Sequence, residues 1–157
     1  MKSVEMKKGR TFVLTLETGE SIKAEIEGFC KTQNITCAKV TVIGGVGAGS
    51  TFVSGPMLVD GKETEPIKPL TYTTDAPAEF AGVGTVFPDE SGNPVMHLHG
   101  SLGRNGMSVT GCFRDKALAW LTLEVIIEEL TGDAPVRKMD PVKAVAPLWN
   151  ERFLTNV

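Results

Sequence analysis

The chain has 157 residues, of which 41% are hydrophobic and 22% charged, and its formal net charge is −3. These values are ordinary for a globular protein and exclude a disordered or fibrous chain. The negative charge argues against a surface adapted to nucleic-acid backbones, which proteins bind through Lys and Arg. The basic start, MKSVEMKKGR, does not fit a secretory signal, and no apolar run is long enough to span a bilayer. We therefore expect a soluble, cytoplasmic, single-domain protein over residues 1–157.

Three cysteines stand at irregular spacing, Cys30, Cys37 and Cys112. Their odd number argues against a disulfide framework and favours reduced thiols. Cys30 continues an apolar pattern at i, i+4, i+7 and i+8, which predicts one face of a helix formed by Ile22, Ile26, Phe29 and Cys30. Thr18 or Ser21 can cap this helix, and it is expected to end near residues 33–34. On that face, Cys30 is expected to be a small core residue.

Strands are predicted on both sides of the helix. Residues 11–16 (TFVLTL) are β-branched and aromatic, and the stretch from Ala38 alternates before a run with glycines at positions 44, 45, 47 and 49. Glycines inside a strand indicate a bulge or the close approach of another backbone. The run lacks the third glycine and the helix of a dinucleotide fingerprint, and the chain has no phosphate-loop motif. The glycines are therefore interpreted as structural.

The remaining pattern is again mostly strand-like. Residues 55–69 hold three prolines and mixed charges and are expected to form a surface excursion. Further strands are predicted over 70–74, 79–87 and 120–130. In the tail, Leu148, Trp149 and Phe153 are expected to pack against the body or a neighbouring subunit. Together with the helix, these strands predict an α/β domain.

A hairpin is predicted over Met96–Arg114, because Asn105-Gly106 is the strongest short signal for a two-residue type I′ turn. With these two residues as the loop, His99 faces Cys112 and His97 faces Arg114. With the loop one residue earlier, His97 faces Cys112 instead. In both registers Cys112 lies on the histidine face, because cross-strand parity is kept.

Two imidazoles and a thiolate on one face of a hairpin can converge on a metal ion. Zinc is bound by His nitrogen at about 2.0–2.1 Å and by Cys sulfur at about 2.3 Å, and another divalent transition metal is also compatible. Three protein ligands leave a fourth position for water or substrate, as in catalytic zinc sites. The sequence therefore predicts a metal site at His97, His99 and Cys112. The alternative is that both histidines are ordinary surface or interface residues and Cys112 a minor core thiol.

The order of these motifs resembles the plants-and-prokaryotes conserved (PPC, also DUF296) domain of the prokaryotic stand-alone type. The resemblance covers about residues 10–131 and is most specific in HLHGSLGRNGMSVTGCF. It implies an α+β fold with a mixed, antiparallel-rich β-sheet and flanking helices, followed by the tail at 132–157. Family members typically have H-x-H followed by G-G-H, and Cys112 stands here in place of the third histidine.

The resemblance also implies a homotrimer and an acidic residue near the site, for which Glu79 is our candidate proton-handling residue. The alternative for Glu79 is an exposed ion pair. A metal-dependent small-molecule binding or catalytic role is ranked first, and whether the protein is an enzyme is left open. DNA-associated regulation is second, because plant relatives carry AT-hook motifs that this chain lacks. A purely structural trimer with a relic site is third.

Overall fold

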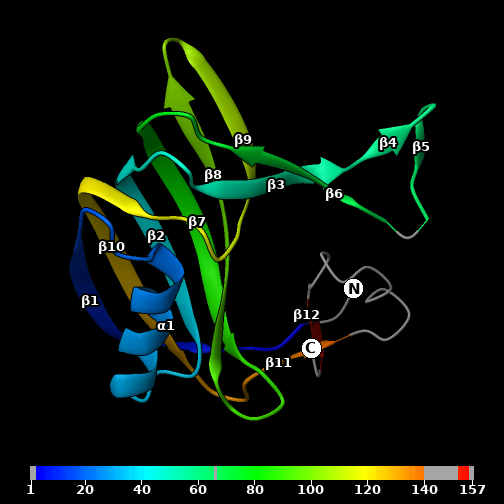
Figure 1. Ribbon diagram of the computed structural model, residues 1–157. Helices are drawn as coiled ribbons and strands as arrows, with labels where there is room; N and C mark the ends of the chain where they lie inside the picture. Colours follow the sequence, from blue (N-terminus) through cyan, green and yellow to red (C-terminus); the bar gives the residue numbers. More distant parts are fainter. Residues whose placement is uncertain (1–2, 66, 140–151, 156–157) are drawn as a thin grey trace.

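The computed structural model describes residues 3–65, 67–139 and 152–155, and most of these lie in strands (Figure 1). Of the described residues, 61% lie in strands and 8% in helix. In chain order the elements are β1 (Lys7–Glu17), α1 (Ile22–Thr32), β2 (Ala38–Val46), β3 (Thr51–Pro56), β4 (Leu58–Val59), β5 (Lys62–Glu63), β6 (Pro69–Thr73), β7 (Ala78–Pro88), β8 (Pro94–Arg104), β9 (Met107–Phe113), β10 (Ala119–Thr131), β11 (Val136–Met139) and β12 (Arg152–Thr155).

The prediction of an α/β fold with flanking helices is wrong. An eight-stranded antiparallel sheet in the order β1-β10-β2-β7-β8-β9-β3-β6 dominates, and α1 is the sole helix among the described residues. The physical reason is in the apolar pattern, which has a helical period only over residues 22–30 and alternates with period two elsewhere. Additional helices were implied by the resemblance alone. Among the described residues, α1 lacks the length and apolar character that a helix needs to cross a bilayer.

The one helix forms as its sequence predicts. Of the two candidate caps, Ser21 is the N-cap, and its side chain accepts a hydrogen bond from the Ala24 backbone N–H at 3.4 Å. Thr18 instead accepts a hydrogen bond from the Leu121 backbone N–H at 2.8 Å. The apolar face of α1 buries Ile22, Ile26 and Cys30 against the sheet. This contact, rather than intrinsic propensity, stabilises an 11-residue helix in water.

The two faces of the main sheet differ in how far other elements cover them. One face packs against α1 and holds the core, whose fully buried side chains include Val42, Leu98 and Val125. On the other face, one row of paired residues crosses six strands: Val13, Ile126, Thr41, Val83, His99 and Cys112. The exposed fractions of its apolar side chains are 71% for Val13, 41% for Ile126 and 56% for Val83, and 49% for neighbouring Ile43. We call this surface, defined by Val13, Ile43, Val83 and Ile126, the open face.

The predicted close backbone approach occurs at Gly44. Here β10 carries a bulge between Trp120 and Leu123, and Gly44 has φ +133°. A Cβ at Gly44 would lie 2.7 Å from the Leu123 Cα. The glycine therefore permits the irregular pairing of β2 with β10.

Two segments extend away from the main sheet. β3 and β6 continue into a ribbon with β4 and β5 at its tip, which is the predicted surface excursion (Figure 1). β11 and β12 form a separate two-stranded sheet that the sequence pattern did not predict. Leu148, Trp149 and the side chain of Phe153, which were expected to pack against the body or a neighbour, lie outside the described part of the chain.

An ion pair between β1 and β10 makes stability depend on pH. The Glu129 carboxylate accepts hydrogen bonds from Arg10 Nε at 2.7 Å and Nη2 at 2.8 Å, and these bonds lower the pKa of Glu129 to about 2. A lowered carboxyl pKa stabilises the folded state above the ordinary value and loses this effect as the pH falls toward 2. In urea unfolding of metal-free protein at pH 7, Arg10→Ala should be slightly less stable than wild type, because exposed ion pairs contribute little. The difference from wild type should shrink near pH 3. An equal difference at both pH values would contradict this.

Candidate metal centre

The β8–β9 hairpin has the first of the two registers considered from the sequence. Arg104 pairs with Met107, and His99 pairs with Cys112. Asn105 has φ 52° and Gly106 φ 74°, as a type I′ turn requires. The predicted hairpin and its turn are therefore confirmed.

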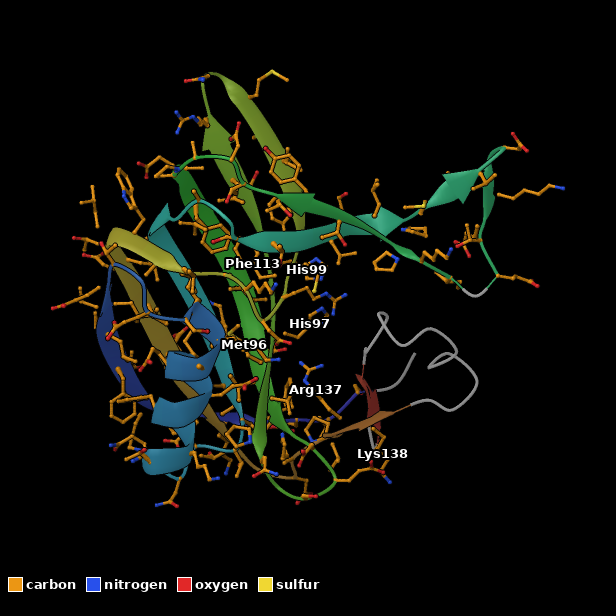
Figure 2. The ribbon with its side chains drawn as sticks, viewed as in Figure 1. Met96, His97, His99, Phe113, Arg137 and Lys138 are labelled. Atoms are coloured by element: carbon orange, nitrogen blue, oxygen red, sulfur yellow. The ribbon has the colours of Figure 1, made fainter. Side chains whose placement is uncertain are left out.

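His97 and His99 lie on the side of the sheet away from α1 (Figure 2), and Cys112 lies with them. The Nε2 atoms of the two imidazoles are 2.9 Å apart and share a hydrogen bond. One ligand atom from each histidine and the Cys112 Sγ all lie within 4.8 Å of one another. His99 is exposed, whereas Cys112 is only 4% exposed. The thiol therefore forms the floor of the cluster, and the histidines border solvent.

The donor set fits a tetrahedral metal ion. Around zinc, His nitrogen and Cys sulfur ligands lie roughly 3.3–3.8 Å apart. The present separations, 2.9 Å between the imidazoles and up to 4.8 Å overall, bracket that range. Side-chain rotations that move atoms by about an ångström would complete the geometry. Two nitrogens and one sulfur suit zinc and other borderline-soft divalent metals better than calcium or magnesium.

On the core side of the sheet, behind the histidines, the side chains pack tightly around Phe80. Its ring lies on the core side of the sheet, over Gly82 and Gly100, which pair with each other across β7 and β8. A Cβ at Gly100 would overlap the Phe80 ring and lie 2.7 Å from the Ala81 carbonyl oxygen. This glycine follows His99 directly, so it couples core packing to the position of a candidate ligand.

Gly100→Ala is therefore expected to lower the free energy of unfolding by about 1–3 kcal/mol, the usual cost of overpacking. Urea denaturation of the metal-free protein measures this effect. Gly103→Ala is the matched control, because a Cβ there has 3.9 Å to its nearest neighbour, the Met107 carbonyl oxygen. Equal stability of the two variants would contradict the packing argument.

Glu79, the candidate proton-handling residue, is not brought to the cluster within this chain. It pairs with Gly103, four residues along β7 from Val83, which pairs with His99. Four residues of extended strand span about 13 Å. A role for Glu79 at the metal centre therefore requires the carboxylate of another copy of the chain.

Two charged residues beside the centre were missed from the sequence. Arg137 of β11 is 4% exposed, and its Nη2 donates a hydrogen bond to Thr85 Oγ1 at 2.7 Å. Thr85 is the β7 partner of His97. Glu27 of α1 accepts a hydrogen bond from the Met96 backbone N–H at 2.8 Å. In the sequence, Glu27 was marked only by its position beside the apolar face of the helix. Arg137 was overlooked because it lies in a segment that was interpreted as a tail.

Comparisons with known proteins agree with the fold and the sequence motifs. The family model of the Plants and Prokaryotes Conserved (PCC) domain matches residues 3–131. No curated protein matched the chain. The structure is similar to a metal-containing protein from Archaeoglobus fulgidus, with a TM-score of 0.79 and 23% identity, covering 99% of this chain and 100% of that one.

Two other solved structures share the fold at low identity. A plant- and prokaryote-conserved (PPC) protein from Pyrococcus horikoshii has a TM-score of 0.77 and 21% identity, covering 100% of this chain and 99% of that one. A protein from Bacteroides thetaiotaomicron, provisionally described as DNA-binding, has a TM-score of 0.69 and 14% identity, covering 96% of each chain. The family match spans most of the sequence, including the hairpin that carries the candidate metal centre, and the chain belongs to the Plants and Prokaryotes Conserved domain family.

Proposed function

We propose that this protein binds a divalent transition metal, zinc in the first place, through His97, His99 and Cys112. The observation that carries the proposal is the convergence of three ligand atoms within 4.8 Å on one strand pair. The similarity to a metal-containing protein of the same fold supports it. When bound, zinc with three protein ligands offers one open position and acts as a Lewis acid.

The surroundings of the centre favour a small-molecule binding or catalytic role over a purely structural one. A shallow groove of about 450 Å³ lies beside His99 on the open face. Its walls are mainly apolar, with hydroxyl groups from Thr41, Ser101 and Thr110. A ligand in this groove would reach the open metal position with one polar group while its apolar part lies against Val83.

We also propose that the protein is a homotrimer, as the family resemblance implies. The open face supports self-association, because contiguous exposed apolar side chains commonly form protein interfaces. Val83 pairs with His99 in the sheet, so a neighbouring copy seated on this face would border the metal centre. In such an assembly the groove gains a second wall, and Glu79 of another copy could supply the proton-handling carboxylate.

Zinc titration of chelator-stripped protein by isothermal calorimetry tests the metal proposal. We expect one zinc per chain in wild type and a loss of at least about tenfold in affinity in His99→Ala. Identical binding by wild type and His99→Ala would show that zinc binds elsewhere. If wild type does not bind zinc, the proposed function is refuted. The third role considered from the sequence, a purely structural trimer with a relic site, would then be favoured.

A DNA-associated role is the second candidate. Its support is that two solved structures of this fold, from Bacteroides thetaiotaomicron and Ralstonia eutropha, are provisionally described as DNA-binding. The net charge of −3 disfavours it. Retention on duplex DNA that weakens steeply with salt would place this role first, because such binding releases counterions from phosphates. Elution at low salt would exclude it.

A further inference from the structure

A second hollow, of about 710 Å³, lies between the start of β7 and the β8–β9 turn. Glu79 of β7, Gly103 of β8 and Ser108 of β9 line it, and they pair with one another in a single row across the three strands. Gly103 leaves the middle of this row without a side chain, and a Cβ there would have 3.9 Å to its nearest neighbour, the Met107 carbonyl oxygen. The glycine thus opens a space between the Glu79 carboxyl group and the Ser108 hydroxyl group.

The second hollow adjoins the groove beside His99. Two residues further along each strand, Ala81, Ser101 and Thr110 form the next row and line that groove. Residues i and i+2 of a strand point to the same side of a sheet, so both rows face the side that carries the candidate metal centre. The side chains of this row are small, and the Thr110 hydroxyl donates a hydrogen bond to the Ser101 Oγ at 3.0 Å. The two hollows together form one trough, which runs from the candidate metal centre to Glu79.

An aromatic ring stands beside the carboxylate at the far end of the trough. Trp120 of β10 also lines the second hollow. Trp120 pairs with Gly45 of β2, and Gly45 pairs with Glu79. A Cβ at Gly45 would lie 2.9 Å from the Trp120 Cε3 atom, so the ring extends over this glycine toward Glu79. A carboxylate next to an aromatic face is a combination that binds organic cations.

The Glu79 carboxylate is available to a ligand. Its side chain is exposed, and within the described ranges it forms no hydrogen bond or ion pair. Arg104 lines the same hollow, but its Nη1 donates a hydrogen bond to the Pro77 carbonyl oxygen at 2.6 Å. A cationic group of a ligand can therefore approach the carboxylate from the side of Gly103.

The length of the trough limits the size of the molecule that fits it. Glu79 lies four residues along β7 from Val83, the partner of His99, which corresponds to about 13 Å. A metal–oxygen bond takes up about 2 Å of this distance and an ammonium–carboxylate hydrogen bond about 3 Å, so about 8 Å remain for the ligand. An extended chain of about six carbon atoms spans this length, at roughly 1.2 Å per bond.

We propose that the trough binds linear ω-amino carboxylates of about six carbon atoms, with the carboxylate at the metal centre and the ammonium group between Glu79 and Trp120. This inference rests on the proposed metal binding, which anchors the carboxylate end. Glu79 then acts in its own chain, as a specificity-determining residue that recognises the ammonium group.

The test is calorimetric titration of zinc-loaded wild-type protein with 6-aminohexanoate, hexanoate and 4-aminobutanoate. Hexanoate has the length but lacks the ammonium group, and 4-aminobutanoate has the ammonium group but is too short to reach Glu79. We expect 6-aminohexanoate to bind about fivefold more tightly than either, the size of effect that an ion pair beside an aromatic ring provides.

Two variants assign the preference to the far end of the trough. Glu79→Gln removes the charge and keeps the shape, so it should lose the preference for 6-aminohexanoate over hexanoate. Gly103→Val fills the hollow and should weaken binding of 6-aminohexanoate. Glu90→Gln is the matched control, because Glu90 is an exposed glutamate in the loop after the other end of β7, and it should match wild type. All three variants should keep the zinc affinity of wild type.

The zinc titration of wild type separates the two possible failures. Equal affinities of zinc-loaded wild type for 6-aminohexanoate and hexanoate would overturn the inference and leave the metal proposal intact. An unchanged preference in Glu79→Gln would overturn it as well, because the ammonium group would then be bound elsewhere. Failure of wild type to bind zinc would instead refute the proposed function, and the inference with it.

Discussion

Replacing Cys112 by Ser is expected to weaken zinc binding by more than roughly 100-fold, because it removes one of three protein ligands and the only soft one. The hydroxyl oxygen is smaller than the sulfur and is not deprotonated at neutral pH, so it cannot replace a thiolate. Metal content after dialysis against a weak chelator, together with a chelator-competition affinity, measures the effect. The variant should retain the folded sheet, since the side chain changes by one atom.

Cys30→Ser is the matched control. Both thiols are buried, Cys30 fully and Cys112 to all but 4% of its surface, so both substitutions place the same hydroxyl at a buried position. Cys30 lies on the core face of α1, and burial raises the pKa of its thiol to about 11. Among the described residues Cys30 belongs to no cluster of candidate ligands, so it is not expected to bind metal. Equal metal content in Cys112→Ser, Cys30→Ser and wild type would show that Cys112 is no ligand.

If the protein is the proposed homotrimer, Val83→Asp is expected to dissociate it. Val83 is 56% exposed in the single chain and lies in the middle of the open face. At an interface between copies the new carboxylate would be buried without a partner and close to its symmetry mates, at a cost of several kcal/mol. Sedimentation equilibrium should give wild type three times the chain mass of 16.8 kDa and the variant a single chain mass.

Met107→Asp is the control for charge alone. Its side chain is 75% exposed at the start of β9, next to the hairpin turn and away from the open face. It should leave the trimer intact. A monomeric wild type at micromolar concentration would refute the trimer, and a trimeric Val83→Asp would place the interface elsewhere.

The helix and the strands of the main sheet could be predicted because local pattern determines them, whereas β11 and β12 were not predicted. The helical face of Ile22, Ile26 and Cys30 and the Asn105-Gly106 turn both form as predicted. The predicted fold class was wrong, because additional helices were taken from a family resemblance rather than from a helical period in this sequence. Strand order depends on pairing between distant segments, such as β1 with β10, which no local pattern encodes.

The candidate site was predictable to the extent that it lies on one hairpin. Parity alone placed Cys112 with the two histidines in both registers that were considered, and the structure has the one with Asn105-Gly106 as the loop. Glu79 was assigned from the resemblance, and its distance along β7 could not be judged without the register of β7 on β8. Arg137 reaches His97 through Thr85, a contact across more than 50 residues of sequence that composition cannot reveal.

X-ray absorption at the zinc edge of stoichiometrically loaded wild-type protein tests the central claim most directly. The proposed centre predicts one sulfur scatterer at about 2.3 Å and two imidazole nitrogens at about 2.0–2.1 Å, with a further light atom completing four-coordination. The sulfur contribution should vanish in Cys112→Ser protein loaded at high zinc concentration. A wild-type spectrum with only nitrogen and oxygen neighbours, or with no imidazole scattering, would contradict the assignment of His97, His99 and Cys112 as the metal ligands.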